Sequence, residues 1–149
     1  MIALIQRVIN AEVRICEKTA AKINNGLLIF LGIAHEDGEK QSDYLIKKIL
    51  NLRIFEDENK KMNLSILDLK GDILLVSQFT LCADTKKGNR PSFVKAAPPE
   101  KAEQLYLDFI NRMKKEAGNL KIETGVFAAD MKVSLINDGP VTIWLDTED

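Results

Sequence analysis

The sequence contains few of the residues that build metal centres and nucleophilic catalytic sites. Its 149 residues include two cysteines and one histidine. Cys16 and Cys82 lie far apart without the spacing of zinc ligands, so we predict no metal site. A disulfide between them is compatible with the sequence, but two thiols in a reducing cytosol are the simpler interpretation. Any Ser-His-Asp or Cys-His site would have to use His35, which we interpret as a surface residue at the end of an apolar strand.

Long hydrophobic runs and phosphate-binding loops are missing as well. The most continuous apolar segments, residues 30–34 and 73–76, are too short to cross a bilayer. The N-terminal segment has its first basic residue, Arg7, after the apolar run and lacks a small-residue cleavage pattern, which is typical of a strand and not of a signal peptide. No glycine-rich loop precedes a helix, so we expect no nucleotide cofactor. We therefore predict a cytoplasmic protein without a cofactor or a membrane partner.

The charges nearly cancel, with a formal net charge of −1. The overall charge does not indicate a nucleic-acid partner, and we expect no binding to DNA. Segment 84–95 differs, because it carries Lys86, Lys87, Arg90 and Lys95 against one acidic residue. Such a local excess can contact phosphate, and a solvated surface loop explains it equally well on charge alone.

The order of the predicted elements indicates a single α/β domain over residues 1–149. Hydrophobic residues make up 46% and charged residues 29%, which is typical of a globular domain, and no segment resembles a repeat or a linker. Apolar patterns predict strands in segments 2–8, 13–15, 20–23, 27–34, 62–67, 73–76, 120–123, 131–136 and 141–145.

Two amphipathic helices are expected between these strands. The first begins at Ser42 as N-cap and ends near residues 54–55, and the second begins at Pro98-Pro99 and ends at Gly118. We predict a mixed, largely antiparallel sheet with barrel-like layers and both helices packed over it. Two helices leave sheet edges uncovered, and pairing with a second copy would protect them, so we also predict a homodimer.

Two polar stretches lie where predicted core strands end. Residues 77–81 (Ser-Gln-Phe-Thr-Leu) follow the apolar run 73–76, and residues 137–142 (Asn-Asp-Gly-Pro-Val-Thr) separate the last two strands. Side chains at a strand end are held rigidly and reach solvent, which favours a site, although Ser and Thr that only satisfy backbone groups are the alternative. The Gly139-Pro140 pair is either an ordinary turn or a cis peptide.

Taken together, these two stretches resemble the paired signature of the D-aminoacyl-tRNA deacylases. The likeness covers essentially the whole chain and includes segments 2–8, 53–55, 61–64, 90–93 and 127–131. The resemblance implies an ester hydrolase that releases D-amino acids, and glycine from mischarged tRNA, from the 3′ end of tRNA. It also implies a homodimer in which Gly139-Pro140, with a cis bond, enters the partner subunit's site and rejects L-amino acids.

The resemblance also implies roles for individual residues. The catalytic residues would be Ser77, Gln78, Phe79 and Thr80. The residues for substrate binding and chiral rejection would be Arg7, Phe127, Ala128, Met131, Asn137, Gly139 and Pro140, with Arg7 supporting the Gly-Pro element. The candidates for contact with tRNA are Lys86, Lys87 and Arg90.

Ester hydrolysis needs stabilisation of a developing oxyanion, which main-chain N–H groups at a strand end can supply. We expect those of Gln78 and Phe79 to do so. As a nucleophile, Thr80 would need a nearby base that the sequence does not offer, so we favour a water positioned by the 2′-OH of the terminal ribose. A nucleic-acid-binding dimer without catalysis and a structural dimer without a ligand are the alternatives.

Overall fold

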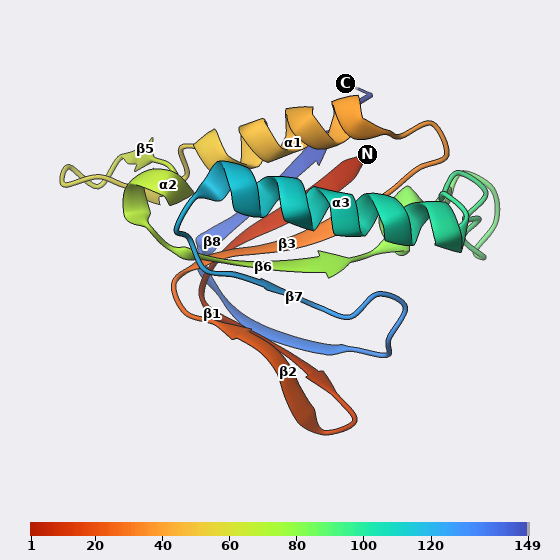
Figure 1. Ribbon diagram of the computed structural model, residues 1–149, viewed down its shortest axis with the longest axis horizontal. Helices are drawn as coiled ribbons and strands as arrows, with labels where there is room; N and C mark the ends of the chain where they lie inside the picture. Colours follow the sequence, from red (N-terminus) through yellow and green to blue (C-terminus); the bar gives the residue numbers. More distant parts are fainter. Residues whose placement is uncertain (149) are drawn as a thin grey trace.

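A long N-terminal strand, β1 (Ile2–Ile15), is the centre of the sheet in the computed structural model, which describes residues 1–148. Its first half pairs antiparallel with β3 (Gly26–Gly32) and its second half with β2 (Lys18–Ile23). The last strand, β8 (Lys132–Asp146), pairs antiparallel along the other edge of β1. Parallel pairing then joins β3 to β6 (Asp72–Ser77) and β6 to β7 (Ile122–Thr124), so the sheet is mixed (Figure 1).

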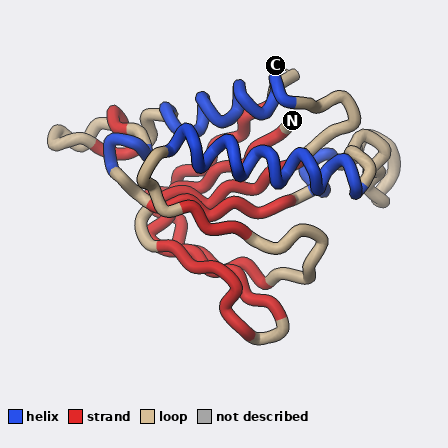
Figure 2. The backbone as a smooth tube through the Cα atoms, viewed as in Figure 1, coloured by secondary structure: helices blue, strands red, loops and turns tan. Residues whose placement is uncertain are grey.

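Two long helices lie together over one face of this sheet. They are α1 (Glu39–Asn51) and α3 (Pro99–Ala117), drawn in blue above the red strands in Figure 2. The remaining elements are the short helix α2 (Ile66–Leu69), the 3₁₀-helix η1 (Phe79–Cys82) and a small ribbon of β4 (Phe55–Glu56) and β5 (Met62–Leu64). No helix within residues 1–148 is long and apolar enough to cross a membrane.

The core lies on both faces of strands β3 and β6, because their successive side chains point in opposite directions. Leu27, Ile29 and Leu31 belong to the cluster that α1 and α3 cover. Leu28 and Leu74 belong to a second cluster, which the outer parts of β1, β2 and β8 enclose from the other side. The sheet therefore curls around its own centre, and the predicted α/β fold with barrel-like layers and two main helices is confirmed.

Several local predictions are wrong, and pairing between distant segments explains them. Segments 2–8 and 13–15 form one strand, and segments 131–136 and 141–145 form another, because β1 and β8 pair with each other over most of their lengths. Ser42 is not an N-cap: α1 begins at Glu39, and Ser42 lies buried in its first turns. Segment 62–67 contains only the three residues of β5 before α2 begins.

The two cysteines do not form a disulfide. Cys16 is exposed in the turn between β1 and β2, whereas Cys82 is buried in η1, and both are free thiols. Burial raises the pKa of the Cys82 thiol, and we therefore expect Cys16 to be the more reactive of the two.

The close approach of β3 to β6 generates a first prediction. A Cβ on Gly26 would lie 1.8 Å from the main-chain oxygen of Asp72, so Gly26→Ala has to push the two strands apart. We expect Gly26→Ala to lower the free energy of unfolding by about 3 kcal/mol, at the upper end for overpacked sites. The measurement is urea unfolding followed by circular dichroism. Gly38→Ala is the control, because its nearest heavy atom would be 3.9 Å away, and equal losses in both variants would contradict the prediction.

Candidate active site

A pocket of about 810 Å³ opens where strand β6 ends. Residues 77–79 form one wall, residues 127–131 form the opposite wall, and segment 93–99 closes a third side. Side chains of β3 and β6, including Leu31 and Val76, line its depth. A largely apolar pocket of this volume is typical of sites for small organic ligands.

Main-chain N–H groups become available at the start of η1. The N–H of Gln78 donates to the Leu31 carbonyl at 2.8 Å and is therefore not free to bind a ligand. The N–H groups of Phe79 and Thr80 have no partner among the hydrogen bonds of residues 1–148, since the first turn of a helix leaves its N–H groups unused. The Gln78 N–H, which we expected to be an oxyanion donor, is therefore occupied, and the unused N–H groups here are those of Phe79 and Thr80.

The Thr80 hydroxyl has an amide as its neighbour and not a base. Gln78 Nε2 donates to Thr80 Oγ1 at 2.6 Å. An amide cannot remove a proton from a hydroxyl in either orientation of its two ends. Within the described chain no histidine or carboxylate is hydrogen-bonded to Thr80, which is exposed at the pocket's edge. The contacts therefore do not include the base that a threonine nucleophile requires.

The opposite wall, formed by residues 127–131, is linked to strand β6 through Leu75. The Leu75 carbonyl accepts from the Gly125 N–H at 2.9 Å and from the Tyr106 hydroxyl at 2.9 Å. Burial raises the pKa of Tyr106, so this hydroxyl remains a donor, and its ring packs near Phe127 with centroids 6.0 Å apart. These bonds hold Phe127, Ala128 and Met131 across the pocket from Ser77, Gln78 and Phe79.

The Gly-Pro stretch is a bulged part of β8 and not a turn between two strands. Gln6 pairs with Thr142 and Val8 with Asn137, so residues 138–141 lie opposite the single residue Arg7. The Gly139-Pro140 bond is cis, and Gly139 has a φ of 131°, which favours glycine. The Asn137 side chain bridges the bulge, because it accepts from the Val141 N–H at 2.7 Å and donates to the Val141 carbonyl at 3.1 Å.

Arg7 supports this bulge from inside the protein. Its side chain is buried, and its Nε donates to the Asp138 carbonyl at 3.0 Å and lies 3.2 Å from Asp138 Oδ2. At its other end, Nη1 donates to the Ile54 carbonyl at 2.6 Å. A planar guanidinium with several fixed donors suits such divergent contacts. The bulge is thus fixed to the segment that follows α1.

The structure does not bring all the predicted site residues together. Ser77, Gln78, Phe79, Phe127, Ala128 and Met131 line the pocket, and Thr80 lies beside it. Four predicted site residues do not line this pocket, namely Arg7, Asn137, Gly139 and Pro140. Gly139 and Pro140 are exposed to solvent.

The predicted tRNA-contact residues lie on a loop that leaves and rejoins the pocket. Lys86, Lys87 and Arg90 are exposed between Asp84 and Ser92, whose main chains exchange hydrogen bonds of 2.7 and 2.9 Å. The loop starts directly after η1 and continues into Phe93 and Val94, which line the pocket. Phe93, Tyr106 and His35 were not among the predicted site residues, because their positions depend on contacts between distant segments.

No cluster of three or more His, Cys, Asp or Glu side chains within residues 1–148 is arranged to hold a metal ion. The pocket instead offers an apolar interior, two unused main-chain N–H groups and a few hydroxyl and amide groups. Such a set can stabilise an oxyanion and can position water or a substrate hydroxyl, and both are used in the hydrolysis of esters.

Comparison with known proteins agrees with this chemistry. A family model described as D-Tyr-tRNA(Tyr) deacylase matches residues 4–146. A D-aminoacyl-tRNA deacylase of Thermosipho africanus is 55% identical over 148 residues, which are 99% of this chain and 98% of the relative. One of Haemophilus influenzae is 57% identical over 146 residues, which are 98% of this chain and 99% of the relative.

Solved structures share the same fold. One named c-Myc DNA Unwinding Element Binding Protein superimposes with a TM-score of 0.95 at 42% identity, covering 99% of each chain. A probable eukaryotic D-amino acid tRNA deacylase superimposes with a TM-score of 0.83, covering 97% of each chain; at 16% identity this likeness concerns the fold alone.

The match over nearly the whole chain places the protein among hydrolases that act on ester bonds. The chain belongs to the D-Tyr-tRNA(Tyr) deacylase family.

The buried guanidinium generates a second prediction. Arg7→Lys keeps the charge but cannot reach both Ile54 and Asp138, so we expect the free energy of unfolding to fall by about 1.5–3 kcal/mol. Arg14→Lys is the matched control on the same strand, where the side chain is exposed, and we expect a change within about 0.5 kcal/mol. Differential scanning calorimetry measures both variants. A loss for Arg7→Lys no larger than for Arg14→Lys would contradict the supporting role.

Proposed function

We propose that this protein hydrolyses the ester of D-aminoacyl-tRNA, and of glycyl-tRNA formed by mischarging, as a cytoplasmic homodimer. The observation that carries the proposal is the pocket at the end of β6, where unused N–H groups of Phe79 and Thr80 border an apolar cavity. The family assignment supplies the class of substrate. The pocket then receives the amino acid and the terminal adenosine of the tRNA.

Water attacks the ester carbonyl carbon, and the carbonyl oxygen becomes an oxyanion that the Phe79 and Thr80 N–H groups stabilise. Removing one such donor in other hydrolases costs about a hundredfold to a thousandfold in rate. When the tetrahedral intermediate collapses, the 3′-oxygen of the ribose leaves with a proton. The neighbouring 2′-OH positions the water and relays the proton, since the contacts of Thr80 include no base.

Chiral rejection comes from a second copy of the chain. A filter must place something rigid where an L side chain would lie, and the bulge at Gly139-Pro140 is held by Asn137 and Arg7. Because Gly139 and Pro140 are exposed and do not line the pocket of their own subunit, we assign them to the pocket of the partner. Ile9 and Ile136, about half exposed near the bulge, support burial of this surface in a dimer.

The tRNA backbone lies along the basic loop. Lys86, Lys87 and Arg90 are exposed next to the pocket wall, and none of them forms an ion pair within residues 1–148. Unpaired cations beside a pocket for the 3′ end are positioned to contact phosphates.

Binding of nucleic acid without hydrolysis is a second candidate. The relative named as a DNA unwinding element binding protein, which is 42% identical, favours testing it. Incubation with D-tyrosyl-tRNA distinguishes the two functions, because only hydrolysis releases free D-tyrosine. Retention of tRNA or DNA without release of the amino acid would support the binding function alone.

A third prediction concerns the chemical step. We expect D-tyrosyl-tRNA whose terminal ribose lacks the 2′-OH to be cleaved at least about a hundredfold more slowly, in the range of lost proton-transfer catalysis. We expect Thr80→Ala to lose less than about tenfold, whereas removal of a nucleophile can cost about a millionfold. Single-turnover release of radiolabelled tyrosine measures both. An unchanged rate on the 2′-deoxy substrate would refute the role of the 2′-OH, and complete inactivity of a folded Thr80→Ala variant would restore the nucleophile.

A fourth prediction concerns the chiral filter. Insertion of one glycine after Pro140 displaces the bulge, and we expect L-tyrosyl-tRNA to become a substrate because its side chain then fits. The measured quantity is the ratio of initial rates on D- and L-tyrosyl-tRNA. A glycine inserted between Cys16 and Glu17, in the turn between β1 and β2, is the control and should preserve rejection. Continued rejection of the L substrate by a folded dimer of the first variant would argue against the filter.

A further inference from the structure

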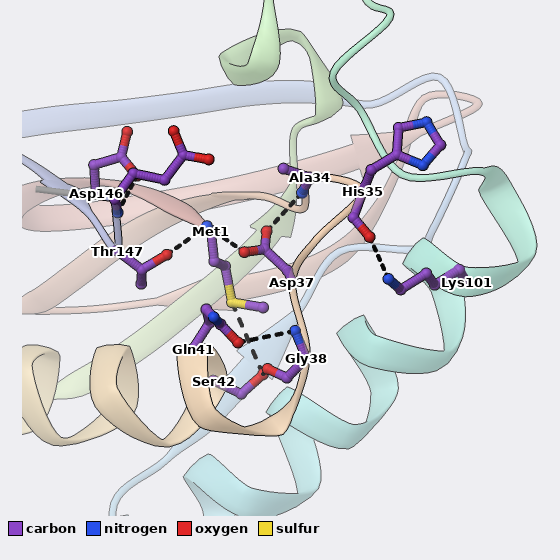
Figure 3. A network of polar contacts seen from close by, with 11 residues as sticks. Met1, Ala34, His35, Asp37, Gly38, Gln41, Ser42, Lys101, Asp146 and Thr147 are labelled. Atoms are coloured by element: carbon purple, nitrogen blue, oxygen red, sulfur yellow. Dashed lines mark hydrogen bonds and ion pairs between the residues drawn. The ribbon is translucent and has the colours of Figure 1, made fainter.

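The only histidine of the chain lies at the mouth of the pocket. His35 lines the pocket together with segment 93–99, and its side chain is exposed. Figure 3 shows the imidazole turned away from the polar network that lies beneath it. No hydrogen bond of this side chain occurs within residues 1–148, so both ring nitrogens are available to a ligand.

The main chain of His35 is fixed on both sides. Its N–H donates to the Lys95 carbonyl at 3.0 Å, and its own carbonyl accepts from Lys101 Nζ (Figure 3). These bonds join the end of β3 to the third wall of the pocket and to the first turn of α3. The main chain that carries the imidazole is therefore fixed before any ligand arrives, so a contact has to order only the side chain.

A buried ion pair stabilises the turn behind His35. Asp37 Oδ2 accepts from the Ala34 N–H at 2.6 Å, and Asp37 Oδ1 lies 2.6 Å from the amino group of Met1, which also donates to Thr147 Oγ1 at 2.7 Å. Figure 3 shows Asp37 between these groups. A buried carboxylate with all these partners forms a rigid base for the mouth of the pocket.

Charged side chains of both signs lie around His35. Lys95 and Lys101 flank it, and neither forms an ion pair within the described residues. The neighbouring acids are Glu36 and Asp37 on the same turn, Glu100 on α3 and Asp130 on the far wall. Asp37 is paired with the Met1 amino group, and Asp130 lies 3.1 Å from Lys132. The two lysines and the two remaining acids, Glu36 and Glu100, therefore balance, so an anion at this position depends on the imidazole itself.

We propose that His35 binds a phosphate of the tRNA 3′ end at the mouth of the pocket. This inference rests on the proposed function, because an apolar pocket that holds the amino acid and the terminal adenosine places the adjoining phosphate outside it. His35 then acts as a binding residue whose contact strengthens when the imidazole is protonated. It takes no part in the chemical step.

The first test separates binding to phosphate from every other role. We expect His35→Ala to raise KM for D-tyrosyl-tRNA roughly twofold to fivefold without changing kcat, in the range of an exposed ion pair. Hydrolysis of D-tyrosyl-adenosine, which has no phosphate, should be unchanged. Lys18→Ala, an exposed position on the β1–β2 hairpin, is the control. An unchanged KM on tRNA, or an equal rise on both substrates, would overturn the inference.

The second test uses pH, because a protonated imidazole carries the charge that attracts a phosphate and the chain has one histidine. The probe is tRNA that carries D-tyrosine through an amide and is not cleaved. We expect the wild type to bind it roughly twofold to fivefold more tightly at pH ~6 than at pH ~8. His35→Ala should abolish this dependence, and His35→Lys should bind tightly at both values. Persistence of the dependence in His35→Ala would contradict the proposal.

These measurements distinguish the inference from the proposed function. If the wild type fails to release D-tyrosine from tRNA, the proposed function is wrong, while binding of uncharged tRNA at the two pH values still tests His35. If release is efficient and the His35 variants behave as the wild type, only the phosphate contact is refuted. Thermal unfolding of each variant establishes that the comparison is made between folded proteins.

Discussion

The constraint on which the structure depends is the burial of β3 and β6 on both faces. Leu27 and Ile29 pack beneath the helices while Leu28 packs into the second cluster, so both faces of these strands are largely buried. Buried main-chain groups must then be satisfied by neighbouring strands. Pairing ends only at Ser77, and Gln78 makes the last such contact, with Leu31. The first unused N–H groups after the core therefore lie where the pocket opens.

The second organising feature is a part of the β1–β8 pairing in which β8 has more residues than β1. Four residues of β8, 138–141, lie opposite Arg7, and the extra chain cannot remain in the plane of the sheet. A buried guanidinium and the Asn137 amide hold it in one conformation. The fold thus has a pocket at the end of β6 and a rigid projection on β8. In a symmetric dimer the projection of each subunit would meet the pocket of the other, because an isologous interface makes every contact twice.

The pocket and its mouth differ in chemistry, which suits a substrate that is apolar at one end and anionic at the other. Phe79 and Phe93 contact each other at 5.0 Å between ring centroids on the pocket's wall. The basic groups lie outside, on the loop 84–95, on α3 and at His35. All of them are attached to segments that line the pocket. Under the proposed function, contacts with the tRNA would therefore be mechanically linked to the position of the ester.

The sequence by itself determined the fold class, the helix that begins at Pro99, and the two polar stretches, because these follow from local patterns of apolar residues, capping and motif. It did not determine the continuity of β1 and β8, the start of α1 at Glu39, or the loss of the Gln78 N–H to Leu31. Those depend on partners far away in the chain. Only the tertiary structure separated Gly139-Pro140 from its own pocket and brought His35 to the mouth, because both positions result from pairing between distant strands and loops.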